Sequence, residues 1–294
     1  MTEDYSYEAS VKSRASDEPI NTYVLRPAAG FLVRALYRTP VTPNQVTLAA
    51  TAAGFAAALL YLQGTPLLTA AAGLLLTLKD TLDSADGQLA RAKGMFSRAG
   101  RFLDSIGDFA VNLAVFTTIG AAMMRSGSGP AAPVLCLLGF IGISLRVSYH
   151  VFYQTSFLHL ENAYTGNRTS EEIRQEDASE DRLTGTLHRA FLFLYGWQDA
   201  LIARIDAACR GSAAHGEEAE RTWYGDITGV RLSGFLGLGT ELFVLTAFSL
   251  FNRLDLYLLF NALGMNLVLL VCIAYRRAVL RGKSGGVSPS GRRS

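Results

Sequence analysis

Six long apolar stretches follow one another along the chain, and polar segments separate them. A transmembrane helix needs about 20 predominantly apolar residues. Each stretch reaches or approaches that length, and the six begin near residues 45, 66, 97, 131, 228 and 255. The second and third are apolar at one end and rich in carboxylates at the other. This pattern predicts an all-α, polytopic membrane protein with six transmembrane helices.

Basic residues are distributed unevenly over the connections between these stretches. Of 27 Lys and Arg residues, only Arg125 and Arg253 lie in the short links on one side of the predicted bundle. Cytoplasmic connections carry an excess of basic residues. We therefore expect both termini, the 91–101 turn and the 156–227 connection to lie in the cytoplasm. We expect the membrane to be the plasma membrane of the cell.

The polar segments outside the bundle have distinct patterns. Residues 1–19 contain no apolar core typical of a secretory signal and predict a flexible cytoplasmic lead-in. Residues 20–38 combine apolar positions at helical spacing with arginines, which predicts an interfacial helix; a soluble helix packed on the cytoplasmic side is the alternative. Within the membrane domain, 20–275, the 156–227 insertion predicts one or two cytoplasmic helices. Residues 276–294 form a basic cytoplasmic tail.

Composition supports a membrane protein and excludes several functional classes. Half of the residues are hydrophobic and 18% are charged, below the roughly 25% typical of soluble domains. The net charge of +2 argues against nucleic-acid binding. Three widely spaced cysteines, Cys136, Cys209 and Cys272, predict neither a disulfide framework nor a zinc site.

Five aspartates occupy the carboxylate-rich ends of the second and third apolar stretches. Carboxylates are costly inside a membrane and usually have a function there. Asp83 and Asp86 lie on one face of a helix, whereas Asp104 and Asp108 lie one turn apart on the next helix. A hairpin through the short turn between these helices brings the two carboxylate faces together. Asp80 lies outside this spacing. Pairing or capping with Lys79 is the interpretation we favour for it, and a role in support of the motif aspartates is the alternative.

Four facing carboxylates repel one another unless cations neutralise them. Hard divalent ions such as Mg²⁺, Mn²⁺ or Ca²⁺ prefer carboxylate oxygens. One or two such ions could hold a pyrophosphate between the helices. Gly87 and Gly100 leave room for a ligand, and Arg91 is placed to meet phosphate charge.

The complete pattern is Asp83-x2-Asp86-Gly87-x2-Ala90-Arg91-x8-Gly100-x3-Asp104-x3-Asp108. It resembles, at all eight specified positions, the signature of the CDP-alcohol phosphotransferase (CDP-alcohol phosphatidyltransferase) family. The resemblance implies transfer of a substituted phosphate from a CDP-activated donor to a hydroxyl acceptor, with release of CMP. It also implies that Mg²⁺ or Mn²⁺ binds the four aspartates and that Asp108 is the general base.

Further residue roles follow from the resemblance alone. The residues expected to contact the nucleotide or donor are Pro43, Asn44, Thr47, Gly87, Ala90, Arg91, Ser97 and Gly100. The donor implied is CDP-diacylglycerol, with a soluble CDP-polyol as the alternative. A polyol phosphate such as inositol phosphate or glycerol phosphate is the acceptor we expect, in phospholipid biosynthesis. Members often form homodimers within the membrane.

The acceptor site and the competing functions depend on weaker signals. Arg146, His150 and Arg231 lie at predicted cytoplasmic helix ends and could bind a phosphorylated acceptor, although membrane flanks carry such residues without that role. A cation channel or transporter is the alternative function, and it would require acidic residues that continue to the far leaflet. A catalytically inactive scaffold would be expected to have lost part of the motif.

Overall fold

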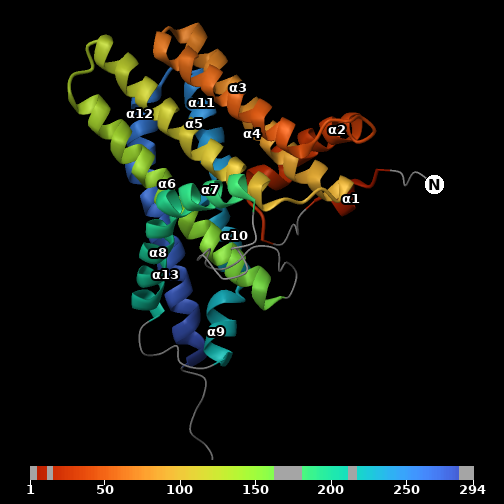
Figure 1. Ribbon diagram of the computed structural model, residues 1–294. Coiled ribbons are helices and arrows are strands. Elements are labelled where there is room, and N and C mark those ends of the chain that lie inside the picture. The colour runs from red at the N-terminus through yellow and green to blue at the C-terminus, as the bar shows by residue number, and fades with distance from the viewer. Residues whose placement is uncertain (1–4, 12–15, 162–180, 211–216, 285–294) are drawn as a thin grey trace, which may run out of the picture.

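The computed structural model describes residues 5–11, 16–161, 181–210 and 217–284, and within these ranges every regular element is a helix (Figure 1). The remainder of the predicted lead-in, insertion and tail lies outside the described residues. The long helices are α3 (Pro43–Gln63), α4 (Pro66–Lys93), α5 (Arg98–Arg125), α6 (Ala131–Leu160) and α13 (Met265–Ser284). The shorter helices are α1 (Tyr7–Ser10), α2 (Arg26–Leu36), α7 (Arg182–Phe191), α8 (Trp197–Arg210), α9 (Glu217–Tyr224), α10 (Ile227–Ser233), α11 (Leu238–Leu250) and α12 (Leu254–Leu259).

Short irregular helical turns extend several of these helices. They are η1 (Asn21–Leu25) before α2, η3 (Leu192–Gly196) between α7 and α8, η5 (Gly234–Leu236) before α11, and η6 (Phe260–Gly264) between α12 and α13. As a result α7 continues through η3 into α8, and α12 continues through η6 into α13.

Capping residues define the ends of the helices that carry the predicted site. Thr42 and Gln45 form a reciprocal capping box at the start of α3, and Pro43 occupies its first turn. Ser97 begins α5, where its hydroxyl accepts from Gly100 N at 2.9 Å. Gly94 ends α4 with a φ of 65°, which glycine adopts without steric cost. These capping residues therefore favour a tight hairpin between α4 and α5.

Several helices meet the length and composition expected of a membrane span. Four qualify directly: Pro43–Gln63, Arg98–Arg125, Ala131–Leu160 and Leu254–Gly282. A fifth candidate consists of Glu218–Leu236 and Leu238–Leu250, which meet at a bend of 41°. Helix α4 is not among these spans because Lys79 and Asp80 interrupt its apolar part after Leu78. The all-α membrane class is confirmed, whereas six separate spans remain a prediction.

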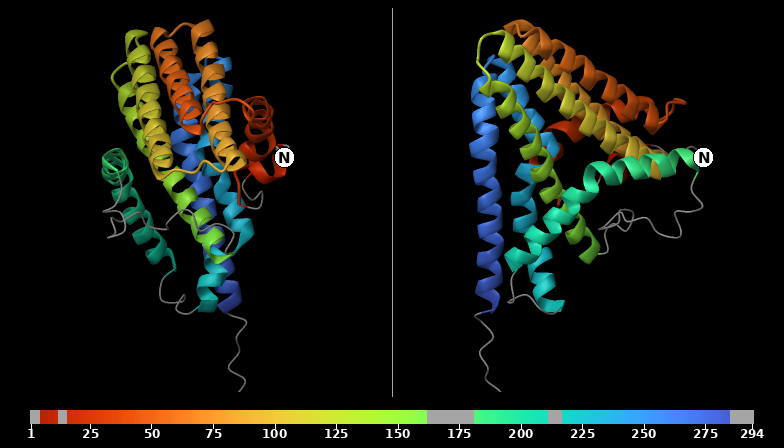
Figure 2. Two further views of the ribbon diagram at one scale, coloured as in Figure 1. Left: turned by 45° about the vertical axis from the view of Figure 1, so that its right-hand side comes forward. Right: turned by 60° about the vertical axis from the view of Figure 1, so that its left-hand side comes forward.

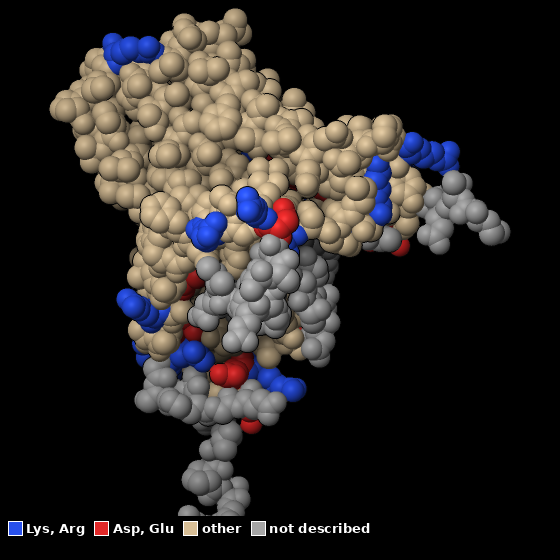
Figure 3. All heavy atoms as spheres, viewed as in Figure 1, with Lys and Arg blue, Asp and Glu red and all other residues tan. Residues whose placement is uncertain are grey.

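The apolar core lies where the long helices cross. Helix α3 packs along α4 and α5, and α11 packs against α4 from the other side. Fully buried residues from these helices, including Tyr61, Leu76, Val111 and Leu242, form the centre of the core. In Figure 3 the visible surface over the upper parts of α3 to α6 is almost free of charge, and most charged side chains gather lower on the molecule. This distribution is typical of a bundle with one end embedded in lipid.

The N-terminal segments pack beside the α4–α5 hairpin. Val33 of α2 is buried in a cluster with Val46 of α3 and Leu89 of α4. Tyr23 and Phe31 remain exposed on the opposite side. The helix predicted over 20–38 is thus present, and its position at a membrane surface stays a prediction.

The described part of the 156–227 insertion is helical and is tied to the bundle at Asp206 of α8. The buried Asp206 carboxylate accepts from Tyr153 Oη of α6 at 2.6 Å and from Trp223 Nε1 of α9 at 2.7 Å. Arg276 of α13 donates to the Trp223 carbonyl at 2.8 Å. From this anchor, α8 leads up to α7, which lies crosswise to α13 at the lower ends of α4 and α5 (Figure 2).

Candidate functional site

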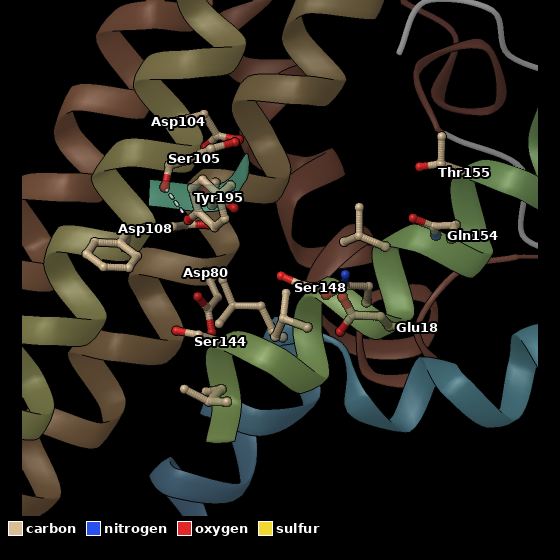
Figure 4. A pocket seen from close by; sticks show the side chains of 18 of the residues that line it. Glu18, Asp80, Asp104, Ser105, Asp108, Ser144, Ser148, Gln154, Thr155 and Tyr195 are labelled. Carbon is tan, nitrogen blue, oxygen red and sulfur yellow. Dashed lines mark hydrogen bonds between the residues drawn. The ribbon is translucent and has the colours of Figure 1, made fainter. Parts of the chain in front are cut away.

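The α4–α5 hairpin brings three of the predicted aspartates together. One carboxylate oxygen from each of Asp83, Asp104 and Asp108 lies within 4.8 Å of the others. Asp104 and Asp108 point into the same space from successive turns of α5 (Figure 4). Because α4 and α5 run in opposite directions from a short turn, Asp83 of α4 lies level with Asp104 and Asp108 of α5.

Asp86 lies beside this group and is held by a different helix. Its carboxylate accepts a hydrogen bond from the Thr47 hydroxyl of α3, and both side chains are buried. Gly100 lies against the start of α3, where a Cβ would come within 2.5 Å of Asn44 Oδ1. A larger residue at position 100 would therefore have to displace the side chains of Asn44 and Ser97.

Lys79 supplies positive charge to the carboxylates. Its Nζ forms an ion pair with Asp108, lies 3.4 Å from Asp80 Oδ1 and lies 4.0 Å from Asp83 Oδ1. The Lys79 side chain is 2% exposed. One ammonium cannot balance the five aspartates of the two helices, so the cluster retains excess negative charge.

The donor set fits a divalent cation. Asp83, Asp104 and Asp108 offer hard oxygen ligands, which Mg²⁺ and Mn²⁺ prefer. Within the part of the chain that the structure describes, Asp104 Oδ1 is buried and has no hydrogen-bond partner. A buried acceptor without a partner is unfavourable. A cation bound between the three carboxylates would remove that cost and reduce their repulsion.

A cavity of about 400 Å³ opens beside the carboxylates. Its walls come from α4, α5 and α6, from the continuous α7–η3–α8 segment, from the start of α11 and from the N-terminal segment. Its polar lining includes Asp80, Asp83, Asp104, Asp108, Asn112, Ser144, Ser148, Gln154 and Tyr195. Ser144, Ser148 and Gln154 lie along α6 opposite the aspartates (Figure 4). The arrangement places hydroxyl and amide groups across the cavity from the acidic cluster.

Residues 16–18 close one side of this cavity. The backbone carbonyl of Ser16 accepts a hydrogen bond from Gln154 Nε2 at 2.7 Å, and Asp17 forms a 2.8 Å ion pair with Arg26. Glu18 Oε2 accepts from Thr240 N at 3.1 Å, at the start of α11. Burial, together with the nearby Asp17 charge, raises the pKa of Glu18 to about 8. These residues belong to the stretch predicted as a lead-in, and this part of it packs into the bundle.

Tyr195 forms part of the opposite wall. Its hydroxyl donates to the Ser105 carbonyl at 2.8 Å, and its ring packs edge-on against Phe109, with centroids 5.9 Å apart. Burial raises the pKa of Tyr195, and the charges of Asp108 and Asp104 raise it further. Tyr195 therefore stays a neutral donor and fixes the insertion to the turn of α5 between Asp104 and Asp108.

The predicted donor-binding residues surround the hairpin on the side away from the cavity. None of the eight is among the residues that line the cavity. They lie at the start of α3, on the last turns of α4 and on the first turn of α5: Pro43, Asn44, Thr47, Gly87, Ala90, Arg91, Ser97 and Gly100. Arg91 Nε donates to the Ser10 carbonyl at 2.5 Å, so this arginine contacts the N-terminal segment.

The three predicted acceptor-binding residues do not come together at the cavity. Arg146 forms a buried ion pair with Glu241, at 2.5 Å, on the far side of α6. His150 Nδ1 lies 3.1 Å from the Ser233 hydroxyl, and Arg231 is exposed on α10. None of the three is among the cavity-lining residues.

Sequence reasoning missed several contacts of the site, and it named Lys79 only as a partner of Asp80, a pair that the structure contains. Lys79 was available as a charged residue inside an apolar stretch, and its spacing to Asp83 on the same helix face was a usable signal. Asp17, Glu18 and Tyr195 gave no such signal, because their approach to the aspartates depends on tertiary packing.

Comparison with known proteins gives an independent assignment of this region. Residues 40–160 match the family model described as CDP-alcohol phosphatidyltransferase. A relative from Thermococcus kodakarensis, described as a bifunctional IPC transferase and DIPP synthase, is 36% identical over 104 residues. The match covers 35% of this chain and 23% of the relative, so the chain spans less than a quarter of that protein. The matched family segment contains α3, α4, α5 and α6 with all four motif aspartates.

Proposed function

We propose that residues 40–160, which match the family model described as CDP-alcohol phosphatidyltransferase, form a domain of that kind. In this proposal the protein transfers a substituted phosphate from a CDP-linked donor, CDP-diacylglycerol, to a hydroxyl acceptor and releases CMP. The observation that carries the proposal is the meeting of Asp83, Asp104 and Asp108 at the edge of a cavity. The domain is of a transferase family, and the chain is a membrane protein.

The residues around the carboxylates support separate positions for donor and acceptor. The donor-binding set, from Pro43 to Gly100, lies on the α3 side of the hairpin, whereas the cavity lies on the α6 side. In this proposal the nucleotide occupies the α3 side and the acceptor occupies the cavity. The transferred phosphorus is then positioned between them, beside the aspartates.

The chemistry requires one proton transfer and one displacement. The acceptor oxygen forms a bond to phosphorus, the bond from phosphorus to the CMP oxygen breaks, and CMP leaves with that electron pair. Asp108 accepts the hydroxyl proton, since it lines the cavity and borders the other two aspartates. Mg²⁺ or Mn²⁺, when held by Asp83, Asp86, Asp104 and Asp108, would supply positive charge for the phosphates.

The acceptor we propose is a polyol phosphate, in line with the Thermococcus relative, which is described as a bifunctional IPC transferase and DIPP synthase. Ser144, Ser148 and Gln154 offer hydrogen bonds to a polyol, and Arg101 is a cationic residue at the cavity. Arg146, His150 and Arg231 receive no support from the cavity lining. We further propose a plasma-membrane location with a cytoplasmic site, and a homodimer.

The alternative of a cation channel has no support in the helices that carry the aspartates. A path would need acidic side chains along the apolar half of each helix. Helix α4 contains none between Pro66 and Leu78, and α5 contains none after Asp108.

Purified protein incubated with CDP-diacylglycerol and a panel of acceptors tests the proposal. The panel contains inositol phosphate, glycerol phosphate, serine and inositol, and CMP release and the mass of the lipid product are measured. We expect CMP and a phosphatidylated product with Mg²⁺ or Mn²⁺ present, and no product after treatment with EDTA. Turnover of CDP-glycerol but not of CDP-diacylglycerol would contradict the lipid donor. CMP release unaffected by EDTA would contradict the metal.

A further inference from the structure

Helix α7 and the turn η3 present an apolar face that nothing in the described residues covers. Phe193 is 82% exposed, Leu183 is 62% exposed and Trp197, where α8 begins, is 53% exposed. We refer to residues 182–197 as the α7 segment. Large apolar side chains grouped on one surface usually mark an interaction site.

The side chains of α7 fall into three sectors around its axis. At about 100° per residue, Thr184 and His188 share one sector, and both are buried against the bundle. Leu183 and Leu187 occupy a second sector beside it. Arg182, Thr186 and Arg189 form the third and are exposed. Continued through η3, the same spacing places Phe193 and Trp197 four and eight residues after Arg189, on the arginine side of the segment. Arginines and aromatic side chains on one exposed side, with leucines beside them, are suited to a helix that lies at a membrane surface.

The α7 segment rests directly on the part of α5 that carries the acidic site. The His188 ring stacks on Phe102, with centroids 4.9 Å apart, and Phe191 packs on the same ring at 5.2 Å. Tyr195 adds its hydrogen bond to Ser105 between Asp104 and Asp108. In Figure 1 α7 crosses the bundle where the charge-free upper region ends, so it runs along the boundary expected between lipid and water.

Apolar side chains are also exposed on α5, against which α7 packs, and on the neighbouring α6. Leu137, Leu138 and Ile141 are exposed on α6, and Leu113 is exposed on α5. Those helices qualify as membrane spans, so lipid is the environment of these side chains. The exposed arginines Arg182 and Arg189 are suited to the phosphate groups of lipids at the surface.

We infer that the α7 segment is an in-plane membrane helix, with Leu183 and Leu187 toward the lipid acyl chains and with Phe193 and Trp197 beside its arginines at the boundary between acyl chains and headgroups. Residues in the insertion are therefore held at the depth of the bilayer surface. Tyr195 of the same segment lines the cavity together with Asp104 and Asp108. The reacting groups therefore lie at the same depth as the bilayer surface. This last consequence rests on the proposed function and favours a donor that stays in the membrane.

Fluorescence quenching tests the inference without reference to activity. The chain has two tryptophans, Trp197 and Trp223, and Trp223 is 2% exposed. Native protein and Trp197→Phe are reconstituted into vesicles of phosphatidylcholine with brominated or unbrominated acyl chains. We expect bromine to quench the native protein much more than the variant, because Trp197 contacts the acyl chains and Trp223 does not. Replacement of an exposed side chain leaves Trp223 as an internal check on folding.

Other occupants of the face give different results. Quenching of Trp197 by aqueous iodide but not by brominated lipid would overturn the inference and put the face in water. Protection from both quenchers would also overturn it and indicate cover by a second copy or another protein.

A second arm connects the helix to turnover. Phe193→Glu is compared with Thr186→Glu, which adds the same charge at a polar position on the same exposed side of the segment. We expect a several-fold loss of transfer with CDP-diacylglycerol for the first variant and little change for the second. Equal transfer rates for the two variants would overturn the link between the membrane position of the α7 segment and transfer. If the lipid quenches Trp197 and no CMP is released from any donor, the membrane helix stands and the proposed function fails.

Discussion

The acidic cluster between α4 and α5 and the Arg146–Glu241 pair between α6 and α11 are both charged groups buried among helices, and they differ in charge balance. Five aspartates of α4 and α5 face one ammonium, that of Lys79. Arg146 and Glu241 form a one-to-one pair in which each side chain is 1% exposed. The first group has negative charge left over, whereas the second does not.

Hydrogen bonding separates the two groups less sharply than charge does. Around the pair, Arg146 Nη1 also donates to Asn266 Oδ1 at 3.1 Å, and Asn261 Nδ2 donates to Glu241 Oε2 at 3.4 Å. Among the described residues, Asp104 Oδ1 of the acidic cluster has no partner, and neither do Arg146 Nη2 and Asn261 Oδ1 around the pair. The excess of negative charge therefore distinguishes the ligand site from the charge-balanced contact between α6 and α11. Four experiments test this distinction.

The largest effect is expected from Asp108→Asn, which removes a carboxylate that can accept a proton. General-base groups typically contribute about 10²- to 10⁴-fold to a rate, and CMP release should fall within that range while the protein still folds. Asp255→Asn is the matched control, since Asp255 forms an exposed pair with Arg253 at the start of α12. Full turnover by Asp108→Asn would exclude it as the base.

Breaking the balanced pair should affect stability before activity. Arg146→Met leaves Glu241 buried without its partner, and loss of one member of a buried pair typically costs about 3–5 kcal/mol. The double variant Arg146→Met with Glu241→Leu should recover most of that loss. Thermal unfolding in detergent measures both. An acceptor-binding role for Arg146 would instead appear as a raised KM for the acceptor in variants that retain stability.

Lys79→Met should expose the excess charge of the acidic cluster. Without the ammonium, repulsion among Asp80, Asp83 and Asp108 increases, so the metal-free variant should unfold at a lower temperature than the native protein. Added Mg²⁺ should then raise the unfolding temperature by more than it does for the native protein. An equal Mg²⁺ effect in both proteins would show that Lys79 and the cation do not share these carboxylates.

The smallest effect concerns Glu18, whose pKa is raised to about 8 from an ordinary 4.5. Below pH 4.5 the group is protonated in both folded and unfolded states. As pH rises toward 8 the unfolded state ionises first, so the stability that Glu18 contributes is progressively lost. Glu18→Gln should avoid that loss, and its advantage in unfolding temperature should grow from pH 5 to pH 8. A constant difference would place Glu18 in a more polar environment than the structure indicates.

Apolar periodicity was sufficient to predict the helices and the hairpin. The predicted start near residue 66 agrees with α4 at Pro66, and the predicted start near 97 agrees with α5 at Arg98. Gly94 and Ser97 mark the ends of the two helices in the sequence itself. Spacing on two helices joined by so short a turn then determines which aspartates can meet.

Contacts between distant segments were beyond such reasoning. The Arg146–Glu241 pair joins positions far apart in the sequence, and charge alone could not distinguish it from a substrate site. The break at Gly237 divides the fifth apolar stretch into α10, η5 and α11. Neither feature has a local signal, because each depends on how α6, α11 and the N-terminal segment pack together.

The anchor at Asp206 also bears on the order in which the protein is made. Asp206 binds Trp223, and the Trp223 carbonyl is held by Arg276 near the end of the last helix. Ribosomal synthesis delivers α4 and α5 to the membrane long before Arg276 is translated. The wall that carries Tyr195 is therefore secured only after the final helix has inserted, so the nascent chain carries its acidic hairpin through most of translation before the cavity is complete.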